Sequence, residues 1–298
     1  MLHSLRIASV VLLVVVLPGD VFAEAAPAGG PRIAVAAAMD DELQPVLSKA
    51  QVERTEIAAG TTFSLGSIHG KPVVLFVTGT SIPNAAATVQ LAIDRYRVNS
   101  LVMTGIAGGI GNDVNIGDVV VCEQWIEFQE NVLARGSGDG FSLPPWAAST
   151  LPPFREAHIR GVRVPGVEGR VQWFAADSAM FAAAKSIKPE MAKCSSILRC
   201  APHPPAYRAG GKCGSSQSFV DNAEWRTYLR DKVGLRLVDM ESAAVMHVLL
   251  RNKVPGIVFR AVSDLAGGGP GKNEAGAFMG LAAENSAKAV LEFLKTFK

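Results

Sequence analysis

The chain has 298 residues, of which 49% are hydrophobic, and its formal net charge at pH 7 is +2. A chain of this length and composition can bury a sizeable core, as one large or two small domains. The near balance of acidic and basic residues argues against a nucleic-acid binder, and against a protein held on membranes by basic residues, because either would need a clustered basic face. We therefore expect the partner to be a small molecule and not a nucleic acid, and we expect no membrane association once an N-terminal signal has been removed.

The N-terminal segment is typical of a secretory signal. Arg6 is followed by an almost unbroken apolar run, Ile7 to Leu17, which is short for a membrane span. Val21-Phe22-Ala23 then offers small residues at the two positions that a signal peptidase reads. We expect cleavage after Ala23 or Ala26, and we assign residues 1–23 to a signal peptide and residues 24–31 to a linker. The mature protein is then expected to be periplasmic or secreted. A retained anchor helix is the alternative.

Four cysteines follow, and export would allow them to form disulfides. Cys122 lies in an apolar run that is typical of a buried strand, so we expect it to be a reduced core thiol. Cys194, Cys200 and Cys213 crowd one irregular stretch, where one pair could bridge and one cysteine would be left over. Their spacing does not match a zinc site, and we predict no metal and no cofactor.

From Arg32 onward, short apolar runs alternate with amphipathic stretches. We expect strands at 32–38, 62–65, 68–71, 72–77, 100–104, 118–123, 235–238 and 256–262. We expect helices at 40–47, 84–96, 173–187, 222–233, 242–252 and 275–297. Strands separated by helices predict a mostly parallel sheet covered on both faces, so residues 32–298 are interpreted as one α/β domain.

Two stretches interrupt this alternation, at 135–169 and 193–214. Pro and Gly are frequent in both, and neither shows a helix or strand period. Long irregular segments inside a compact domain are either functional or flexible. We treat both as inserts in the domain.

Acidic residues stand directly after three of the predicted strands. They are Asp40-Asp41-Glu42, Asp239-Met240-Glu241 and Ser263-Asp264. Glycine turns at 78–80 and 104–109 lie between them, and glycine lets a backbone approach a ligand closely. Ligands of open α/β sheets bind beyond the carboxyl ends of the strands, which favours a site here. Any one of these acids, taken alone, could equally be a helix cap.

Taken together, these blocks resemble the 5′-methylthioadenosine/S-adenosylhomocysteine nucleosidases of the nucleoside phosphorylase superfamily. The resemblance rests on five motifs: Ala38-Met39-Asp40-Asp41-Glu42, Thr104 to Gly109, Asn115 to Val120, Val238 to Ala244, and Arg260 to Asp264. It covers the chain from about Arg32 onward, apart from the two inserts. It implies a phosphorylase/hydrolase-like three-layer α/β/α sandwich with a mixed central sheet, a nucleoside as substrate and a homodimer.

The resemblance also implies roles for individual residues. Asp264 would protonate N7 of adenine, Ser263 would orient Asp264, and Glu42 would be the base that activates water. Asp264 would have to carry a proton at working pH. Expected substrate contacts are Glu241 and Met240 on the ribose, Phe219 and Val220 on the purine, and Gly79, Ala107 and Gly108 in the glycine turns.

Three departures from the family pattern keep other readings open. Ile106 stands where close relatives carry a small hydroxyl residue. The inserts resemble those of exported plant bark-storage and vegetative-storage proteins. That resemblance implies a Cys194–Cys200 bridge and makes a non-catalytic nucleoside-binding or storage protein one alternative.

A phosphorylase is the other alternative function. It would carry an arginine before the glycine block, where this chain has Leu101-Val102-Met103, and Glu42 would repel phosphate. Arg260 could contact the site or form a structural ion pair.

Overall fold

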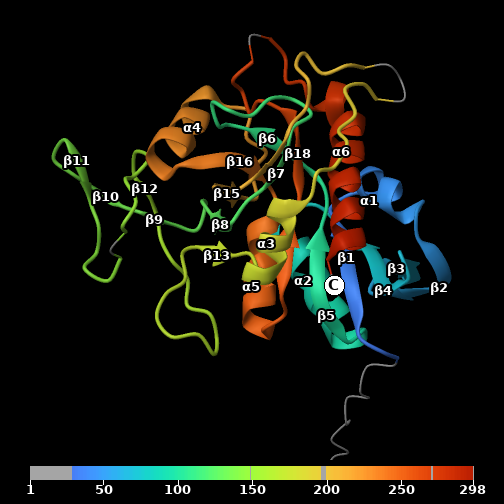
Figure 1. Ribbon diagram of the computed structural model, residues 1–298. Coiled ribbons are helices and arrows are strands. Elements are labelled where there is room, and N and C mark those ends of the chain that lie inside the picture. The colour runs from blue at the N-terminus through green and yellow to red at the C-terminus, as the bar shows by residue number, and fades with distance from the viewer. Residues whose placement is uncertain (1–28, 148, 196–198, 270, 298) are drawn as a thin grey trace, which may run out of the picture.

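In the computed structural model, residues 29–147, 149–195, 199–269 and 271–297 are described. The expected signal peptide and most of the linker lie outside them. Strands form the middle of the molecule and helices cover both sides (Figure 1). The helices are α1 (Asp40–Leu47), α2 (Ile82–Arg95), α3 (Ser178–Ser186), α4 (Ala223–Tyr228), the π-helix η1 (Leu229–Val233), α5 (Ser242–Asn252) and α6 (Ala275–Thr296).

One sheet has six strands, five of which come from the N-terminal part of the chain. Its order is β17 (Gly256–Val258), β5 (Val98–Met103), β1 (Arg32–Ala37), β4 (Lys71–Val77), β3 (Thr61–Ile68) and β2 (Gln51–Ala58). The pairs among β17, β5, β1 and β4 are parallel, whereas β4, β3 and β2 form an antiparallel meander.

The other sheet has eight strands and is also mixed. Its order is β13 (Phe174–Ala175), β8 (Gln124–Glu127), β15 (Lys212–Ser215), β16 (Leu235–Asp239), β6 (Ile106–Gly109), β18 (Arg260–Asp264), β7 (Val119–Val121) and β14 (Tyr207–Ala209). The chain passes from the first sheet to the second twice, from β5 to β6 and from β17 to β18. The carboxyl ends of β5 and β17 in the first sheet therefore lead directly into β6 and β18 of the second.

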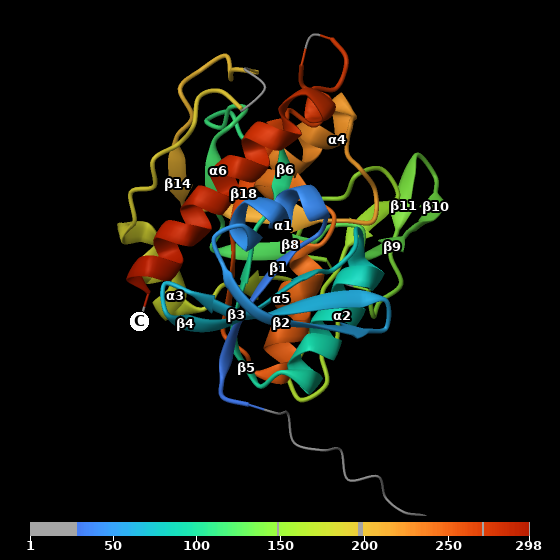
Figure 2. The ribbon, with the colours of Figure 1, turned by 90° about the vertical axis from the view of Figure 1, so that its right-hand side faces the viewer.

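Alternate residues of β1 face opposite helical layers. Ala34 and Ala36 pack in the core cluster that contains α2 and α5, whereas Val35 and Ala37 pack in the cluster that contains α1, α3 and α6. Alternation with two apolar faces is the expected pattern of a strand that is buried on both sides. Figure 2 shows α1 and α6 on the side that faces the viewer. The mixed α/β fold with two helical layers is thereby confirmed, although its strands divide between two sheets.

Several expected elements differ from those observed. Residues 173–187 were expected to be one helix, but β13 comes first and α3 begins only after Asp177, whose side chain accepts hydrogen bonds from Ala179 N and Met180 N. The expected 256–262 strand is divided at Phe259 into β17 and β18. The edge strand β2 was not expected, because its residues are mostly exposed and polar and so lack an apolar alternation.

The two irregular stretches also contain strands. In the first, β10 (Arg135–Ser137) pairs with β11 (Gly140–Ser142), and β12 (Ala157–Ile159) pairs with β9 (Asn131–Leu133). The β10–β11 hairpin projects from the body of the molecule (Figure 1). In the second stretch, β14 and the start of β15 belong to the eight-stranded sheet. The irregular part of that stretch therefore ends before Tyr207.

The structure contains two disulfides, which join Cys194 to Cys200 and Cys122 to Cys213. The first pairing confirms the expected bridge. The expectation of a reduced Cys122 was wrong: the strand is buried as expected, but Cys213 of β15 is brought to it from 91 residues away. Within the described part of the chain, no helix is both long and apolar enough to cross a membrane.

Candidate active site

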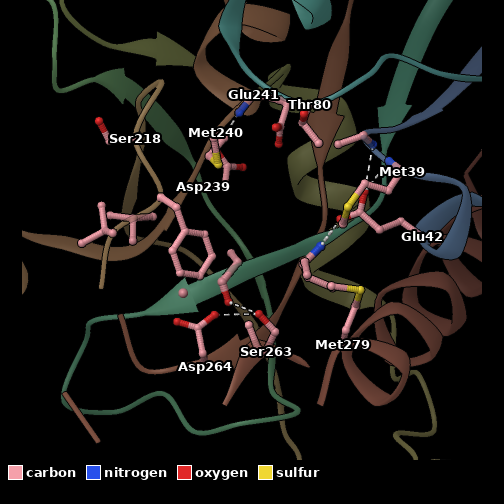
Figure 3. Close-up of a pocket in the computed structure, with 18 residues that line it drawn as sticks. Met39, Glu42, Thr80, Ser218, Asp239, Met240, Glu241, Ser263, Asp264 and Met279 are labelled. Atoms are coloured by element: carbon pink, nitrogen blue, oxygen red, sulfur yellow. Dashed lines mark hydrogen bonds between the residues drawn. The ribbon is translucent and has the colours of Figure 1, made fainter. Parts of the chain in front are cut away.

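One cavity of ≈ 170 Å³ opens where the carboxyl ends of the strands meet the helices (Figure 3). Residues from α1, β6, the segment after β15, the β16–α5 junction, β18 and α6 line it. All but one of the site residues expected from the sequence line this cavity. They are Glu42, Ala107, Gly108, Phe219, Val220, Met240, Glu241, Ser263 and Asp264. The exception is Gly79, which is not among the lining residues.

Glu42 lies in the first turn of α1, and its carboxylate accepts hydrogen bonds from three backbone N–H groups. Its Oε2 accepts hydrogen bonds from Ala38 N at 2.8 Å and Met39 N at 3.0 Å, and its Oε1 accepts one from Ile106 N at 2.8 Å. The residue is 1% exposed. Burial raises the pKa of the Glu42 carboxyl, while Arg260 and the three backbone donors oppose that rise. A buried carboxyl with a raised pKa is suited to accept a proton near neutral pH.

Glu241 lies at the N-terminus of α5, where its carboxylate has two partners. Oε1 accepts a hydrogen bond from Ser81 N at 2.8 Å, and Oε2 lies 3.1 Å from Arg260 Nη2. Burial raises the pKa of Glu241 to about 7, against the lowering effect of Arg260 and with the help of Asp239. Gly79 contributes indirectly, because its positive φ of 79° helps the turn to bring Ser81 N toward Glu241.

Arg260 is completely buried and lies among three carboxylates. Its Nε is 2.7 Å from Asp239 Oδ2, its Nη2 is 3.1 Å from Glu241 Oε2, and its Nη1 is 3.5 Å from Glu42 Oε1. A Cβ atom at Gly105 would lie 2.0 Å from Arg260 Nη1, so only glycine leaves room for the guanidinium. The question that the sequence left open is resolved: Arg260 is both an ion-pair partner and a neighbour of the pocket carboxylates.

Asp239 supports this arginine from β16. Besides Arg260, its carboxylate accepts hydrogen bonds from the hydroxyls of Ser215 and Ser242 and from Glu241 N and Ser242 N. A carboxylate with this many donors is satisfied in the interior. Asp239 therefore fixes the position of Arg260 and, through it, of Glu42 and Glu241.

Asp264 ends β18 on a different side of the pocket from Glu42 (Figure 3). Ser263 Oγ donates to Asp264 Oδ2 at 2.8 Å, and Ala266 N donates to Asp264 Oδ1 at 2.9 Å. Both Ser263 and Asp264 are 1% exposed. The geometry gives Ser263 the orienting contact with Asp264 that the resemblance implied.

Another part of the pocket wall is formed by residues 218–220, which follow β15. Phe219 is 58% exposed although it lines the pocket, whereas Val220 is partly buried against an apolar cluster. An exposed aromatic ring at a pocket mouth is available for stacking on a planar ligand. This exposure argues against the alternative that Phe219 is an ordinary core residue.

The pocket is also lined by residues to which the sequence assigned no role. Six of them belong to the predicted motifs and turns: Ala38, Met39, Thr80, Ile106, Val238 and Asp239. Ser218, Ala275 and Met279 lie outside those motifs. Ala275 and Met279 are four residues apart on α6 and so share one face of that helix. Periodicity shows that they share a face, but only the packing of α6 against β18 reveals that the pocket lies there.

Ile106 begins β6 beside Glu42 and presents an apolar side chain to the pocket. Its backbone N–H serves Glu42, but the side chain offers no polar contact to a bound water or sugar. Within the described residues, no group of three or more His, Cys, Asp or Glu side chains could hold a metal ion. The polar side chains that line this pocket are the carboxylates of Glu42, Asp239, Glu241 and Asp264 and the hydroxyls of Thr80, Ser218 and Ser263.

Comparison with known proteins agrees with this architecture. The family model of the Phosphorylase superfamily matches residues 32–295. The 5′-methylthioadenosine/S-adenosylhomocysteine nucleosidases of Bacillus thuringiensis (strain Al Hakam) and Bacillus cereus (strain AH187) are each 29% identical over 237 residues, which cover 79% of this chain and 87% of each relative.

Solved structures with the same fold include two proteins of Helicobacter pylori. Its 5′-methylthioadenosine/S-adenosylhomocysteine nucleosidase, in complex with a small organic ligand, has a TM-score of 0.67 at 21% identity, covering 90% of this chain and 99% of that chain. Its futalosine hydrolase has a TM-score of 0.66 at 21% identity, covering 89% and 97%. With a family model that matches almost the whole described chain, the protein belongs to the phosphorylase superfamily.

Proposed function

We propose that this protein hydrolyses the N-glycosidic bond of adenine nucleosides such as 5′-methylthioadenosine or S-adenosylhomocysteine and releases adenine. The observation that carries the proposal is the convergence of Glu42, Glu241 and Asp264 on one pocket, each held by its own hydrogen bonds. A reaction with an oxocarbenium-like sugar needs an acid at the leaving group and a base for water, and the pocket offers both.

In the proposed reaction, Asp264 donates a proton to N7 of adenine while the bond between C1′ and N9 breaks. Water attacks C1′, and Glu42 accepts its proton, so that adenine and a free ribose derivative are the products. Each such proton transfer contributes on the order of 10²–10⁴-fold to the rate. Ser263 orients Asp264 through its 2.8 Å hydrogen bond.

The sugar is assigned to the space between these two acids. Glu241 accepts hydrogen bonds from the ribose hydroxyls, and Met240 packs on the sugar. Phe219 stacks on the purine, and Val220 offers its backbone to the edge of the base. Ala107 and Gly108 form the floor, where a Cβ at Gly108 would lie 3.3 Å from Asp264 Oδ1.

Hydrolysis is favoured over phosphorolysis by the surroundings of Arg260. A phosphate site needs a cation that is free to bind an anion. Arg260 is already paired with Asp239, Glu241 and Glu42, so the pocket is richer in negative than in positive charge. A storage protein without catalysis would need none of the three carboxylates, yet all three are present and buried.

The names of the relatives support the same reaction class. The curated relatives are nucleosidases that act on methylthioadenosine and adenosylhomocysteine by name, and one structural neighbour from Neisseria meningitidis, with a TM-score of 0.67 and 22% identity, binds methylthio-immucillin-A. We also propose that the protein is exported to the periplasm or secreted and that it forms a homodimer. These two proposals rest on the N-terminal sequence and on the family resemblance.

A substrate panel tests the reaction class. The purified protein would be incubated with methylthioadenosine, adenosylhomocysteine, adenosine and inosine, with and without phosphate, and the free base and the sugar product would be identified. We expect adenine release from the first two substrates without phosphate. A ribose 1-phosphate product with an absolute need for phosphate would establish a phosphorylase instead, and binding without cleavage would establish a storage or binding protein.

A further inference from the structure

One hydroxyl group in the middle of α6 binds both chain segments that pass from the first sheet to the second. These two crossings are residues 104–105, between β5 and β6, and Phe259, between β17 and β18. Ser286 Oγ donates a hydrogen bond to Phe259 O at 3.0 Å and accepts one from Gly105 N at 3.1 Å. It also lies 2.8 Å from Thr104 Oγ1. A single side chain of α6, which packs beside α1 and β18 (Figure 2), thus joins the two crossings.

The hydrogen-bonding capacity of this hydroxyl is fully used. A serine hydroxyl has one proton to donate and two lone pairs that accept. Because a carbonyl oxygen can only accept, the proton of Ser286 goes to Phe259 O, and its two lone pairs accept from Gly105 N and from the Thr104 hydroxyl. Ser286, Thr104 and Phe259 are all 0% exposed. Loss of the serine oxygen would therefore leave buried polar groups without this partner, and they would have to move to find another.

The first crossing brings a backbone donor to the candidate base. Gly105, whose N–H is bound by Ser286, is followed directly by Ile106, and Ile106 N donates to Glu42 Oε1 at 2.8 Å. A Cβ atom at Gly105 would lie 2.7 Å from Glu42 Oε1, so the backbone itself packs against the carboxylate. Since the peptide unit between Gly105 and Ile106 is planar and stiff, a shift of Gly105 would also move the N–H that Glu42 accepts.

The second crossing brings the cation to the same oxygen. Phe259, whose carbonyl accepts the Ser286 proton, is followed directly by Arg260, and Arg260 Nη1 lies 3.5 Å from Glu42 Oε1. Backbone hydrogen bonds also join the two crossings to each other. Both contacts of Glu42 Oε1 are therefore made by a residue that directly follows one bound by Ser286.

We propose that Ser286 is a positioning residue for Glu42: its hydroxyl fixes the two crossings so that a backbone N–H and a guanidinium both face the Oε1 atom of that carboxylate. The N–H is that of Ile106, and the guanidinium is that of Arg260. Ser286 is not one of the residues that line the pocket, so it acts only through the residues that it binds. The catalytic meaning of this arrangement rests on the proposed function, but the coupling of Ser286 to Glu42 does not.

The coupling can be measured without catalysis at the amide of Ile106. In deuterated protein labelled with ¹⁵N only at isoleucine, the Ile106 signal is the one that disappears in Ile106→Val. Ser286→Ala should weaken the hydrogen bond from Ile106 N to Glu42. The amide proton should then move upfield and exchange with solvent faster than in the wild type, on the order of 10-fold or more. Because Ser286 does not bind Ile106 directly, a role confined to its own three contacts would leave this signal unchanged.

Asn285→Ala is the matched control. Asn285 directly precedes Ser286 on α6 and is also 0% exposed, but its amide binds the backbone of Gly117 and Ala192, outside the two crossings. The substitution should lower thermal stability and leave the Ile106 amide at its wild-type shift. An equal change of that signal in Asn285→Ala and Ser286→Ala would show a general loosening of α6 and would overturn the proposal.

Thr104 provides a second, milder pair of variants. Thr104→Val removes one of the three partners of the Ser286 hydroxyl with little change in side-chain size. It should move the Ile106 signal in the same direction as Ser286→Ala, but less. Thr104→Ser keeps the hydroxyl and should bring the signal back toward its wild-type position.

Kinetics supply the second readout. Ser286→Ala should lower kcat on the order of 10-fold to 100-fold through loss of orientation of the base, with a smaller effect on KM. In the Glu42→Gln background the same substitution should cost little more, because a residue that acts through Glu42 has no effect once Glu42 cannot accept a proton. Fully additive losses would show that Ser286 acts independently of Glu42 and would contradict the proposal.

The amide measurement decides between the proposal and a purely local role. If folded Ser286→Ala keeps the shift and the exchange rate of the wild-type Ile106 amide, the proposal is wrong. Should Ser286→Ala fail to fold, the same outcome in Thr104→Val overturns it. An Ile106 signal that changes as expected, in a protein whose wild type cleaves no nucleoside, would refute the proposed function alone.

Discussion

Arg260 Nη1 lies 3.5 Å from Glu42 Oε1, and both side chains are 1% exposed. The same guanidinium contacts Asp239 and Glu241, so one buried cation holds together three carboxylates that would otherwise repel one another. Because all three of these carboxylates line the pocket, the stability of the fold and the chemistry of the site depend on the same arginine.

Replacing Arg260 by methionine should therefore be strongly destabilising. The substitution leaves Glu42, Asp239 and Glu241 buried without their cation, and breaking a buried ion pair on one side costs about 3–5 kcal/mol. Urea unfolding of Arg260→Met would measure the loss. Arg155→Gln is the control, since Arg155 pairs with Glu224 at the surface and should cost less than about 1 kcal/mol. Equal losses for the two variants would show that the buried cluster does not support the fold.

Substitutions at Glu42 and at Glu241 should have different effects on kcat and KM. Glu42→Gln removes the proposed base, so kcat should fall by about 10²-fold or more while adenine still binds. Glu241→Gln weakens ribose binding in ground and transition states and should change both KM and kcat. Asp41→Asn, which alters the exposed acid next to Glu42, should behave like the wild type. Near-wild-type kcat in a folded Glu42→Gln protein would remove Glu42 from the mechanism.

The free energy of unfolding should depend on pH through Glu241. Its pKa is about 7 in the folded protein and 4.5 in the reference state. Between these values the folded protein keeps a proton that the unfolded chain has released, so the free energy of unfolding falls as pH rises. The full effect is about 3 kcal/mol, from about 1.4 kcal/mol per pKa unit.

Thermal and urea unfolding between pH 4.5 and pH 8 would show this slope. In Glu241→Gln it should be shallower, whereas Glu224→Gln, at an exposed site, should reproduce the wild-type slope. A Glu241→Gln protein with an unchanged slope would place the responsible proton elsewhere.

The two disulfides should differ in their contribution to stability. The Cys122–Cys213 bridge closes a loop of 91 residues, and the Cys194–Cys200 bridge closes one of only 6. The chain-entropy model gives about 4–5 kcal/mol for the long loop and about 2 kcal/mol for the short one. Paired Cys→Ser variants of each bridge, compared by urea unfolding, would measure the difference. Peptide mapping of unreduced protein should recover both bridges, and recovery of free Cys122 would contradict the structure.

The sequence predicted the acidic residues of the site for a physical reason. Glu42, Glu241 and Asp264 each follow an apolar run, and strand ends of an α/β sheet converge at one edge. The sequence alone does not decide between a site contact and a structural ion pair for Arg260, because a buried arginine can be recognised only when the residues around it are known. Ala275 and Met279 of α6 gave no signal, because only the packing of α6 against β18 places them at the pocket.

The fold was predictable where residues alternate or recur with a clear period. Residues 242–252 were expected to be helical and form α5 with the same bounds. In contrast, β2 is an exposed edge strand with polar residues on both faces, so hydrophobic periodicity does not reveal it. The Cys122–Cys213 pairing depends on strand order in the eight-stranded sheet, which local sequence does not encode.

The most direct test of the proposed reaction is adenine release from methylthioadenosine in phosphate-free buffer, followed for the wild type and for Asp264→Asn. The proposed mechanism predicts stoichiometric adenine and free methylthioribose from the wild type, and a rate lower by about 10²-fold or more in the variant, which keeps the shape of the side chain but cannot protonate N7. Absence of adenine release by folded wild-type protein, or an Asp264→Asn variant as fast as the wild type, would contradict it.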